Sequence, residues 1–243
     1  MGNSKLKIIA IVPARGGSKR IPKKNIIYFA GKPLIAWTIE QAISSNLIND
    51  VYVSSNSQEI LSIAINYGAI PIIRPKELSN EKSSSESALL HTIDKMVEEP
   101  DLIVFLQATS PLRKMDDIDN AINKLIEEKA DSLLSLIETQ EFMWEESNGI
   151  FNPLTYDLNN RCDHRSLRRL YYENGSLYII KPEILRRYNN RLGGRKSIYL
   201  MEAWQRADID DYKDYDWCLW NFKRNYSKMY GRELLKEEVA PEI

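Results

Sequence analysis

Short β-prone apolar runs alternate with amphipathic helical stretches over about the first 137 residues of this chain. The first run, residues 8–12, is apolar at every position, as in a parallel strand that is buried on both faces. This alternation predicts an α/β fold, in which helices cover both faces of an open, mostly parallel, Rossmann-like sheet. Ligands of such sheets bind at the carboxyl ends of the strands. Further strands are predicted at residues 51–53, 70–73, 102–106 and 133–137.

Apolar residues at helical spacing lie between these runs. Pro71 indicates that its strand lies at an edge of the sheet, because proline lacks the backbone donor that a central strand uses on both sides. We therefore expect the sheet to end near this strand. The predicted helices cover residues 34–43, 60–67, 89–97 and 118–126.

The alternation breaks over residues 139–173, where aromatic residues, acids and arginines replace the regular pattern. This break predicts an inserted arm suited to contact between subunits. A strand at 176–180, a short helix at 182–188 and a long helix at 211–226 then return the chain to the sheet. We expect three parts: an α/β core at residues 1–138, the arm at 139–173, and a return to the core at 174–243.

Composition argues against several classes of protein. Lys and Arg total 33 against 34 for Asp and Glu, so the net charge of −1 gives no overall attraction to nucleic acid or to an anionic membrane. The longest apolar runs are far shorter than the ~20 residues that a membrane span needs. Cys162 and Cys218 have no zinc-type spacing. We expect a cytoplasmic protein that binds neither nucleic acid nor membrane.

The first predicted strand leads into a loop rich in glycine and cations, VPARGGSKRIPKKN at residues 12–25. Glycines let backbone N–H groups approach phosphate oxygens, and Arg15, Lys19 and Lys24 offset phosphate charge. The pattern is neither GxxxxGK[ST] nor GxGxxG. A solvated basic turn is the alternative, but the coincidence of glycines, cations and a buried strand favours a site for a polyphosphate.

This loop resembles the opening pattern, (I/V)PAR-x-GSK followed by KN, of the CMP-sialic acid synthetases. These are cytidylyltransferases that activate nine-carbon 2-keto sugar acids, and the similarity extends over nearly the whole chain. The resemblance implies a nucleotidyltransferase fold, CTP as a substrate, and catalytic roles for Arg15 and Lys24. It also implies that the nucleotide is bound by the matching residues Ala14, Arg15, Gly17, Ser18, Lys19, Lys24 and Asn25.

A second segment, RPKELS at residues 74–79 followed by three serines at 83–85, is similar to the part of the family that reaches the cytosine and ribose. Arg74 and the hydroxyls of Ser83 and Ser85 have the donors and acceptors that read a pyrimidine edge. The same serines precede an amphipathic run and are typical of a helix N-cap. Both roles are compatible.

Two further segments resemble the family's acceptor-sugar site. LQATSPLR at residues 106–113 matches the family's LQPTSPLR, in which the glutamine, here Gln107, is expected to contact the sugar; alanine replaces the usual proline. A residue that leaves a buried strand is also a crevice candidate on physical grounds. ENGSLYI at 173–179 is similar to the segment that lines the sugar, which implies contacts from Asn174, Gly175 and Ser176.

Asp208 and Asp210 lie on one face if the chain is extended there, and alternate carboxylates suit a hard cation such as Mg²⁺ that also binds phosphate. They match the DID pair of the family. Acids ahead of a helix also serve as N-caps, which is the alternative interpretation. We expect Asp208 and Asp210 to be metal ligands with catalytic roles.

The arm corresponds to the family's dimerisation arm, from which basic residues reach the sugar carboxylate in the partner subunit. The family's arginine falls on His164, with Arg165 adjacent, so Arg165 is the candidate for sugar contact. These departures leave open which nonulosonic acid is preferred: N-acetylneuraminate, its deaminated analogue, legionaminate or pseudaminate. The resemblance implies a homodimer through the arm.

Together these features predict attack of the sugar's anomeric hydroxyl on the α-phosphorus of CTP, with Mg²⁺ as cofactor and pyrophosphate as the leaving group. A CMP-Kdo synthetase and a sugar-1-phosphate nucleotidyltransferase share the fold class but carry different opening loops. A catalytically silent nucleotide-binding protein is the alternative from another class. Retention of Arg15, Lys24, Asp208 and Asp210 argues against that last alternative.

Overall fold

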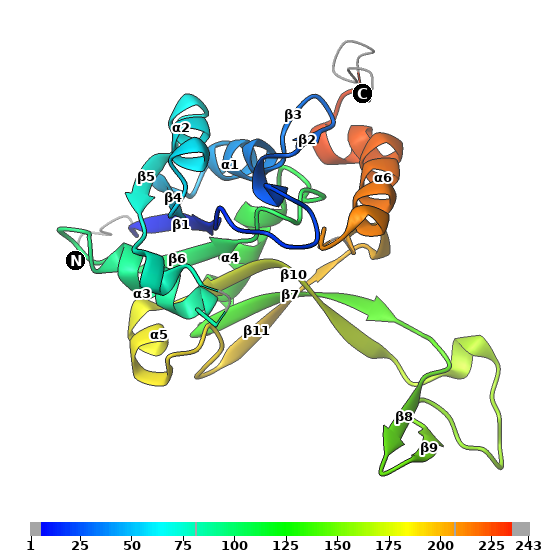
Figure 1. Ribbon diagram of the computed structural model, residues 1–243. Coiled ribbons are helices and arrows are strands. Elements are labelled where there is room, and N and C mark those ends of the chain that lie inside the picture. The colour runs from blue at the N-terminus through cyan, green and yellow to red at the C-terminus, as the bar shows by residue number, and fades with distance from the viewer. Residues whose placement is uncertain (1–5, 81, 207, 235–243) are drawn as a thin grey trace.

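A seven-stranded sheet forms the centre of the computed structural model, which describes residues 6–80, 82–206 and 208–234 (Figure 1). Its strand order is β11-β7-β10-β6-β1-β4-β5. Among the described residues, all neighbouring strands of this sheet are parallel except where β10 pairs with β6 and β7. The strands are β1 (Ile8–Pro13), β4 (Asp50–Ser55), β5 (Ile70–Ile73), β6 (Leu102–Leu106), β7 (Ser132–Thr139), β10 (Leu170–Ile180) and β11 (Lys196–Met201).

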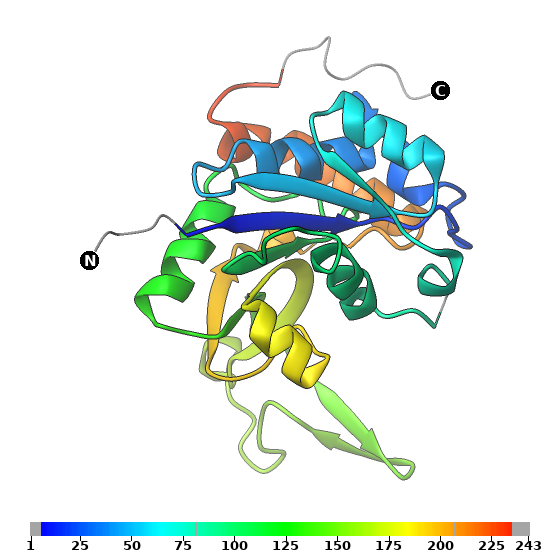
Figure 2. The same cartoon turned by 90° about the vertical axis from the view of Figure 1, so that its left-hand side faces the viewer.

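Helices cover both faces of this sheet, as predicted. The side chains of Ile8, Ala10 and Val12 pack with α1 (Leu34–Ile43), α2 (Gln58–Asn66) and α4 (Asp117–Glu127). Ile9 and Ile11 pack on the other face with α3 (Ser85–Ile93) and α5 (Pro182–Tyr188). Figure 2 shows α2 and α3 on opposite sides of the strands. Continuous burial of β1 therefore explains its unbroken apolar sequence.

The last helix, α6 (Tyr212–Tyr230), packs outside α1, where Phe222 meets Trp37 at 4.6 Å between ring centroids. Asp211 caps its N-terminus by accepting hydrogen bonds from the amides of Lys213 and Asp214. Gly231, with φ of +67°, ends it in the left-handed conformation. The prediction for 211–226 is thus confirmed, with one more turn added. No helix in the described ranges is both long and apolar enough to cross a bilayer.

Some boundaries differ from the predictions. Helix α3 stops at Ile93 rather than 97, and Val97 is fully exposed, so the apolar spacing continued past the true helix end. Strand β11 was not predicted, because it lies at the sheet edge and lacks the two-sided burial that marks β6. Two short strands, β2 (Tyr28–Phe29) and β3 (Lys32–Pro33), were also missed, as were the 3₁₀ turns η1 (Lys24–Ile26), η2 (Lys76–Leu78), η3 (His164–Ser166) and η4 (Ala203–Gln205).

The predicted arm projects from the sheet (Figure 1). Its base is formed where the end of β7 pairs with the start of β10, so the returning strand begins earlier than predicted. Its tip is a hairpin of β8 (Trp144–Ser147) and β9 (Ile150–Pro153). Asn148 and Gly149 both have positive φ, as the two-residue turn of such a hairpin requires. Among the exposed large apolar side chains of the tip are Trp144, Ile150 and Phe151.

Candidate active site

The candidate site lies at the carboxyl edge of the sheet, where β1, β4, β5 and β6 all end. Because β10 runs the other way, its Leu177 pairs with Leu106 at the end of β6 and brings Gly175 to the same edge. A cavity of about 290 Å³ opens there. It is lined by Pro13, Arg15, Lys24, Asn25, Arg74, Leu78, Ser79, Asn80, Ser83, Ser84, Ser85, Phe105, Gln107, Ala108 and Thr109.

Hydrogen bonds fix the two ends of the basic loop. The buried Ala14 donates its amide to the Ser54 carbonyl at 2.9 Å, which continues the β1–β4 pairing into the loop. The side-chain amide of Asn25 donates to the Arg15 carbonyl at 2.9 Å. The matching residues Ala14 and Asn25 therefore shape the loop, and they leave the Arg15 side chain at the cavity.

The two adjacent glycines of the loop have different surroundings. A Cβ at Gly16 would lie 2.9 Å from the Ser57 Cβ, so a side chain there would push the loop away from α2. The Gly16 amide donates to Asn56 Oδ1 at 3.0 Å. A Cβ at Gly17 would meet no protein atom within 4 Å. Gly17 thus leaves open space beside the loop, where a phosphate can approach the backbone.

A second cavity, of about 350 Å³, continues along the loop and ends at a carboxylate. Arg15, Lys24 and Asn25 line both cavities, so the two share a wall. The high density of cations favours an anion with several charged groups. The lining residues of the second cavity are Arg15, Gly17, Ser18, Lys19, Arg20, Lys24, Asn25 and Asp210.

Arg74 adds a buried cation to the first cavity. Its side chain is only 7% exposed, and its Nε donates to Ser79 Oγ at 3.1 Å. Burial, assisted by the positive charge of Arg15, lowers the pKa of Arg74 from its ordinary value. Two arginines that repel each other across a cavity favour the binding of an anion or of a strong acceptor.

The serine cluster caps a helix, as predicted, and it also lines the cavity. Ser84 caps α3 by accepting a hydrogen bond from the Ser87 amide at 3.1 Å. Ser83 and Ser85 line the cavity beside it. Glu86 then forms an ion pair with Arg191 at 2.7 Å, which attaches the start of α3 to the loop after α5. The same serine segment therefore forms both the start of α3 and part of the cavity wall.

Asp208 and Asp210 meet the basic loop from the far end of the chain. Asp210 pairs with Lys24 at 2.8 Å and with Arg20 at 2.6 Å. Burial alone would raise the pKa of Asp210, but these two cations outweigh it and hold the pKa below its usual value. Burial, reinforced by the charge of Asp210, raises the pKa of Asp208, although Thr109 donates to Asp208 Oδ1 at 2.5 Å.

These carboxylates fit a divalent cation. The repulsion that contributes to the raised pKa of Asp208 is relieved by a positive ion between the two groups. Within the described ranges, no cluster of three or more His, Cys, Asp or Glu residues could form an all-protein cage. Mg²⁺ is typically held by one or two carboxylates together with substrate phosphates and water, and this donor set offers that arrangement.

Gln107 and Gly175 face each other across the strand ends. The φ of +70° at Gly175 favours glycine, and an added Cβ would lie 2.7 Å from Gln107 Oε1, so a larger residue would displace the Gln107 side chain. Gln107 Oε1 is buried and has no hydrogen-bond partner in the described part of the chain. An unsatisfied buried acceptor is costly unless a ligand supplies a donor.

The remaining predicted sugar residues are placed differently. Asn174 turns inward, where its Oδ1 accepts from Ser135 Oγ at 2.6 Å, and Ser176 is only 3% exposed. Arg165 lies in η3 of the arm with its side chain 91% exposed, 3.7 Å from Asp163. Gln107 lines the cavity of its own chain, whereas Asn174, Gly175, Ser176 and Arg165 are not among the residues that line it.

Two site residues were missed by the sequence analysis. Arg20 was part of the quoted loop but stands outside the family pattern, and it pairs with Asp210. Thr109 holds Asp208, and its carbonyl accepts the Ile209 amide at 3.0 Å. Both contacts join distant parts of the chain, at separations of 190 and 99 residues for the two side-chain bonds. The pattern of neighbouring residues in the sequence cannot predict pairs that lie so far apart along the chain.

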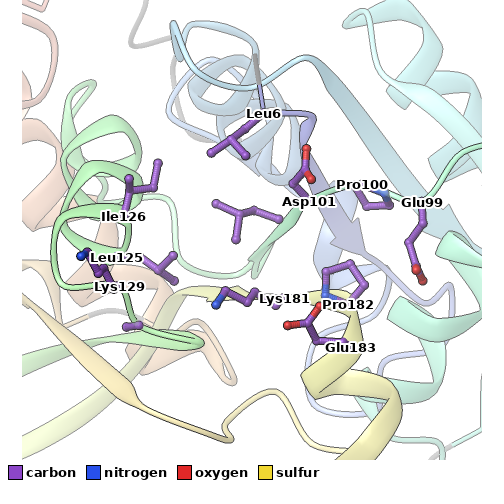
Figure 3. A pocket seen from close by; sticks show the side chains of 12 residues that line it. Leu6, Glu99, Pro100, Asp101, Leu125, Ile126, Lys129, Lys181, Pro182 and Glu183 are labelled. Atoms are coloured by element: carbon purple, nitrogen blue, oxygen red, sulfur yellow. The ribbon is translucent and has the colours of Figure 1, made fainter. Parts of the chain in front are cut away.

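A larger cavity, of about 600 Å³, lies at the opposite edge of the sheet (Figure 3). It is bordered by Asp101 at the start of β6, Ile126 near the end of α4, and Pro182 at the start of α5. None of the motif residues that were predicted to bind ligand lines it. Size therefore does not identify the site here, whereas the convergence of charged groups at the carboxyl edge does.

An open α/β sheet with a cation-rich loop opposite a carboxylate pair suits the binding of a nucleoside triphosphate. The sequence profile of the cytidylyltransferase family matches residues 9–229, so this chain belongs to that family. N-acylneuraminate cytidylyltransferase A of Danio rerio is 36% identical over 214 residues, which cover 86% of this chain and 49% of the relative. Pseudaminic acid cytidylyltransferase of Campylobacter jejuni is 30% identical over 234 residues, which cover 93% and 100%.

A third relative, N-acylneuraminate cytidylyltransferase of Streptococcus agalactiae, is 30% identical over 256 residues, which cover 95% of this chain and 60% of the relative. The chain therefore spans about half of the zebrafish and streptococcal proteins (49% and 60%) and all of the Campylobacter protein. The names of these relatives agree with the resemblance to the CMP-sialic acid synthetases.

Solved structures support the fold. A CMP-2-keto-3-deoxy-manno-octonic acid synthetase, solved with CTP, superposes with a TM-score of 0.67 at 16% identity, covering 91% of this chain and 99% of that one. A 4-diphosphocytidyl-2C-methyl-D-erythritol synthase from Anaerococcus prevotii superposes with a TM-score of 0.65 at 9% identity. The superposition covers 90% of this chain and 97% of that one. At such low sequence identities these structures show a shared fold and nothing more. They confirm the predicted Rossmann-like nucleotidyltransferase sheet.

Proposed function

We propose that this chain transfers CMP from CTP to the anomeric hydroxyl of a nonulosonic acid, a nine-carbon 2-keto sugar acid, and releases pyrophosphate. The observation that carries the proposal is that Arg15 and Lys24 line two joined cavities, one with base-reading groups and one that ends at Asp210. The names of the N-acylneuraminate and pseudaminic acid relatives support a nonulosonic acid as the acceptor.

The nucleotide occupies the first cavity and the loop. Arg74, Ser83 and Ser85 supply donors and acceptors for the cytosine edge and the ribose. The triphosphate follows the loop, where Gly17 leaves room for a phosphate against the backbone and Lys19 adds charge. The α-phosphate then lies at Arg15 and Lys24, between the base pocket and the carboxylates; that both residues line the two cavities supports this assignment.

The chemistry is an in-line displacement at the α-phosphorus. The sugar hydroxyl forms the new P–O bond while the bond to the β-phosphate oxygen breaks, and pyrophosphate leaves. Arg15, Lys19 and Lys24 offset charge on the triphosphate and on the leaving group. Asp208 and Asp210 hold Mg²⁺, which when bound supplies positive charge at the reacting phosphate and acidifies the attacking hydroxyl. Alignment of the two substrates supplies much of the acceleration.

The acceptor lies beside Gln107 at the strand ends. Gln107 Oε1, which lacks a partner among the described residues, accepts a hydrogen bond from an acceptor hydroxyl or amide. Gly175 forms the facing wall, where a larger residue would fill the space. Asn174 and Ser176 support this wall from behind, because both side chains are buried.

The arm completes the site in a homodimer. Exposed apolar side chains at its tip, Trp144, Ile150 and Phe151, support contact with a second copy. Arg165, almost fully exposed in its own chain, then reaches the sugar carboxylate in the partner subunit. A bidentate guanidinium suits a carboxylate better than a point charge does.

We place this reaction in the cytoplasm. Cys162 and Cys218 are both free thiols, and a reducing compartment keeps them so. Burial raises the pKa of the Cys218 thiol well above its usual value, which leaves that side chain unreactive.

The test is pyrophosphate release from CTP and Mg²⁺ with a panel of acceptors: N-acetylneuraminate, its deaminated analogue, legionaminate, pseudaminate and the eight-carbon Kdo. We expect release with at least one nine-carbon acid and not with Kdo. Release with Kdo alone would make the chain a CMP-Kdo synthetase. If folded protein that binds CTP releases no pyrophosphate with any of these acids, the proposal is contradicted.

A further inference from the structure

Arg113 is completely buried beneath the candidate site, although it carries a guanidinium. It ends the LQATSPLR segment and lies between the end of β6 and α4. Burial lowers the pKa of Arg113 to about 10, partly offset by the charge of Asp117, so the side chain remains charged at neutral pH. A buried charge of this kind is costly, and its hydrogen bonds indicate what it maintains.

These hydrogen bonds, in the described part of the chain, all go to neutral oxygens. Arg113 Nη1 donates to Thr38 Oγ1 at 3.2 Å and to Gln41 Oε1 at 3.0 Å, both on α1. Arg113 Nη2 donates to the Gln107 carbonyl at 2.8 Å and to the Ser176 carbonyl at 2.7 Å. Arg113 Nε reaches the same Ser176 carbonyl at 3.2 Å. One guanidinium therefore joins the end of β6 and the middle of β10 to α1.

The main-chain carbonyls of Gln107 and Ser176 belong to the segments that face the acceptor. Gln107 carries the unsatisfied Oε1, and Ser176 follows Gly175, at which an added Cβ would lie 2.7 Å from that same oxygen. The backbone positions of residues 107 and 176 thus set the gap between the Gln107 side chain and the glycine wall. An apolar side chain of similar size at 113 would fill the volume but leave both carbonyls without this donor.

The nucleotide-binding groups are held by other contacts. Asn25 fixes the Arg15 loop, Ser84 caps α3, and Arg74 is bonded to Ser79. The hydrogen bonds of Arg113 reach none of these residues. A change at Arg113 therefore acts on one side of the site.

We propose that Arg113 is a positioning residue that sets the affinity for the acceptor sugar and leaves the affinity for CTP nearly unchanged. The inference rests on the proposed function, because it depends on Gln107 and Gly175 facing the sugar. Lysine at this position keeps the charge but cannot span the two carbonyls and the two α1 oxygens in one plane.

The experiment compares steady-state kinetics of the wild-type chain and Arg113→Lys, with circular dichroism to verify folding. We expect KM for the acceptor to rise about 10- to 100-fold, as for a small misplacement of a binding group, and KM for CTP to change less than about 3-fold. Thr92→Val is the matched control: this threonine is also fully buried on a helix, and its hydroxyl donates to the Ala88 carbonyl away from the site.

If Arg113→Lys does not fold, Thr38→Val replaces it. The Thr38 hydroxyl accepts from Arg113 and donates to the Gln107 carbonyl at 3.3 Å, so its loss loosens the same link at constant charge. Here the acceptor KM should rise about 3- to 10-fold. Equal changes in both KM values, or none, would overturn the inference. A wild-type chain that releases pyrophosphate with none of the acids would overturn the proposed function instead, and this inference with it.

Discussion

The carboxyl edge of the sheet and the arm are built in opposite ways. At the edge, functional side chains are fixed by bonds between distant segments, such as Asp210 with Lys24 and Asp208 with Thr109. In the arm, the contacts are local: Asn148 and Gly149 close a hairpin, and Arg165 is 91% exposed. Under the proposed function, the nucleotide site draws its side chains from one chain, whereas the acceptor site also draws on the arm of a partner subunit.

Cations also differ between the two regions. At the edge they lie against carboxylates and open cavities. In the arm Arg161 lies over the Phe142 ring, 4.5 Å from its centroid, and Arg169 pairs with Glu138 at 3.5 Å. Charges stacked on rings or exposed to water are poorly placed for phosphate chemistry within their own chain. Variants in one region test whether the carboxyl edge and the arm act separately, because each variant should leave the function of the other region unchanged.

The largest expected effect is in the carboxylate pair. In the proposed mechanism Asp210 is a metal ligand that acts in the transition state, so Asp210→Ala should lower turnover about 1,000-fold while CTP binding changes little. Rapid-quench turnover and calorimetric titration of CTP measure the two quantities. Asp216→Ala, an exposed acid on the same segment of chain, is the control and should stay near wild type. Unchanged turnover in Asp210→Ala would contradict the metal assignment.

The basic loop offers a matched pair of lysines. Lys24→Ala should lower kcat/KM for CTP about 100-fold, because it removes a cation from the shared wall of the two cavities. Lys23 is adjacent but pairs with Glu59 at 2.7 Å, away from the cavities, so Lys23→Ala should change kcat/KM less than about 3-fold. Similar losses in both variants would mean that the loop acts only through its overall charge.

The arm should respond differently. Phe151→Asp places a charge at an exposed apolar tip, so sedimentation should show a monomer, and KM for the acceptor should rise about 10-fold with CTP binding unchanged. Ile65→Asp introduces the same charge at an exposed position of α2 and should leave the oligomeric state intact. A Phe151→Asp variant with weaker CTP binding would show that the two regions are not separable.

The smallest effect concerns stability at the edge. Burial by itself raises the pKa of Glu86, but Arg191 outweighs it and holds the pKa below its ordinary value of 4.5. The pair therefore stabilises the fold above that pH, and the stabilisation is lost as the pH falls through the lowered value. Arg191→Gln should cost about 1–3 kcal/mol at pH 7, and less below pH 4.5.

Urea unfolding at both pH values measures this difference. Arg187→Gln, at an exposed residue of α5, should cost less than about 1 kcal/mol at either pH. A constant difference between wild type and Arg191→Gln across the pH range would show that Arg191 stabilises α3 by stacking on Phe105 and Tyr178 rather than through Glu86.

Sequence pattern was most informative where apolar residues are continuous. Both β6, which is buried throughout, and β5, which is an exposed edge strand, match their predicted ranges to the residue. Strand β11 at the sheet edge was missed and the end of α3 was misplaced, because exposed residues there obscure the spacing of the buried apolar positions. At the site, the loop cations were visible in the sequence. Arg20, Thr109 and Arg113 act through contacts across the fold, which no local pattern reveals.

The central claim is that CMP itself moves to the sugar. With the acid that the acceptor panel selects, mass spectrometry and phosphorus NMR of a completed reaction measure which bond of CTP is cut and where the cytidylyl group goes. The account predicts equal amounts of pyrophosphate and of a product in which CMP is joined to the nine-carbon acid. Free CMP with pyrophosphate and unchanged sugar, or CDP with phosphate, would contradict it.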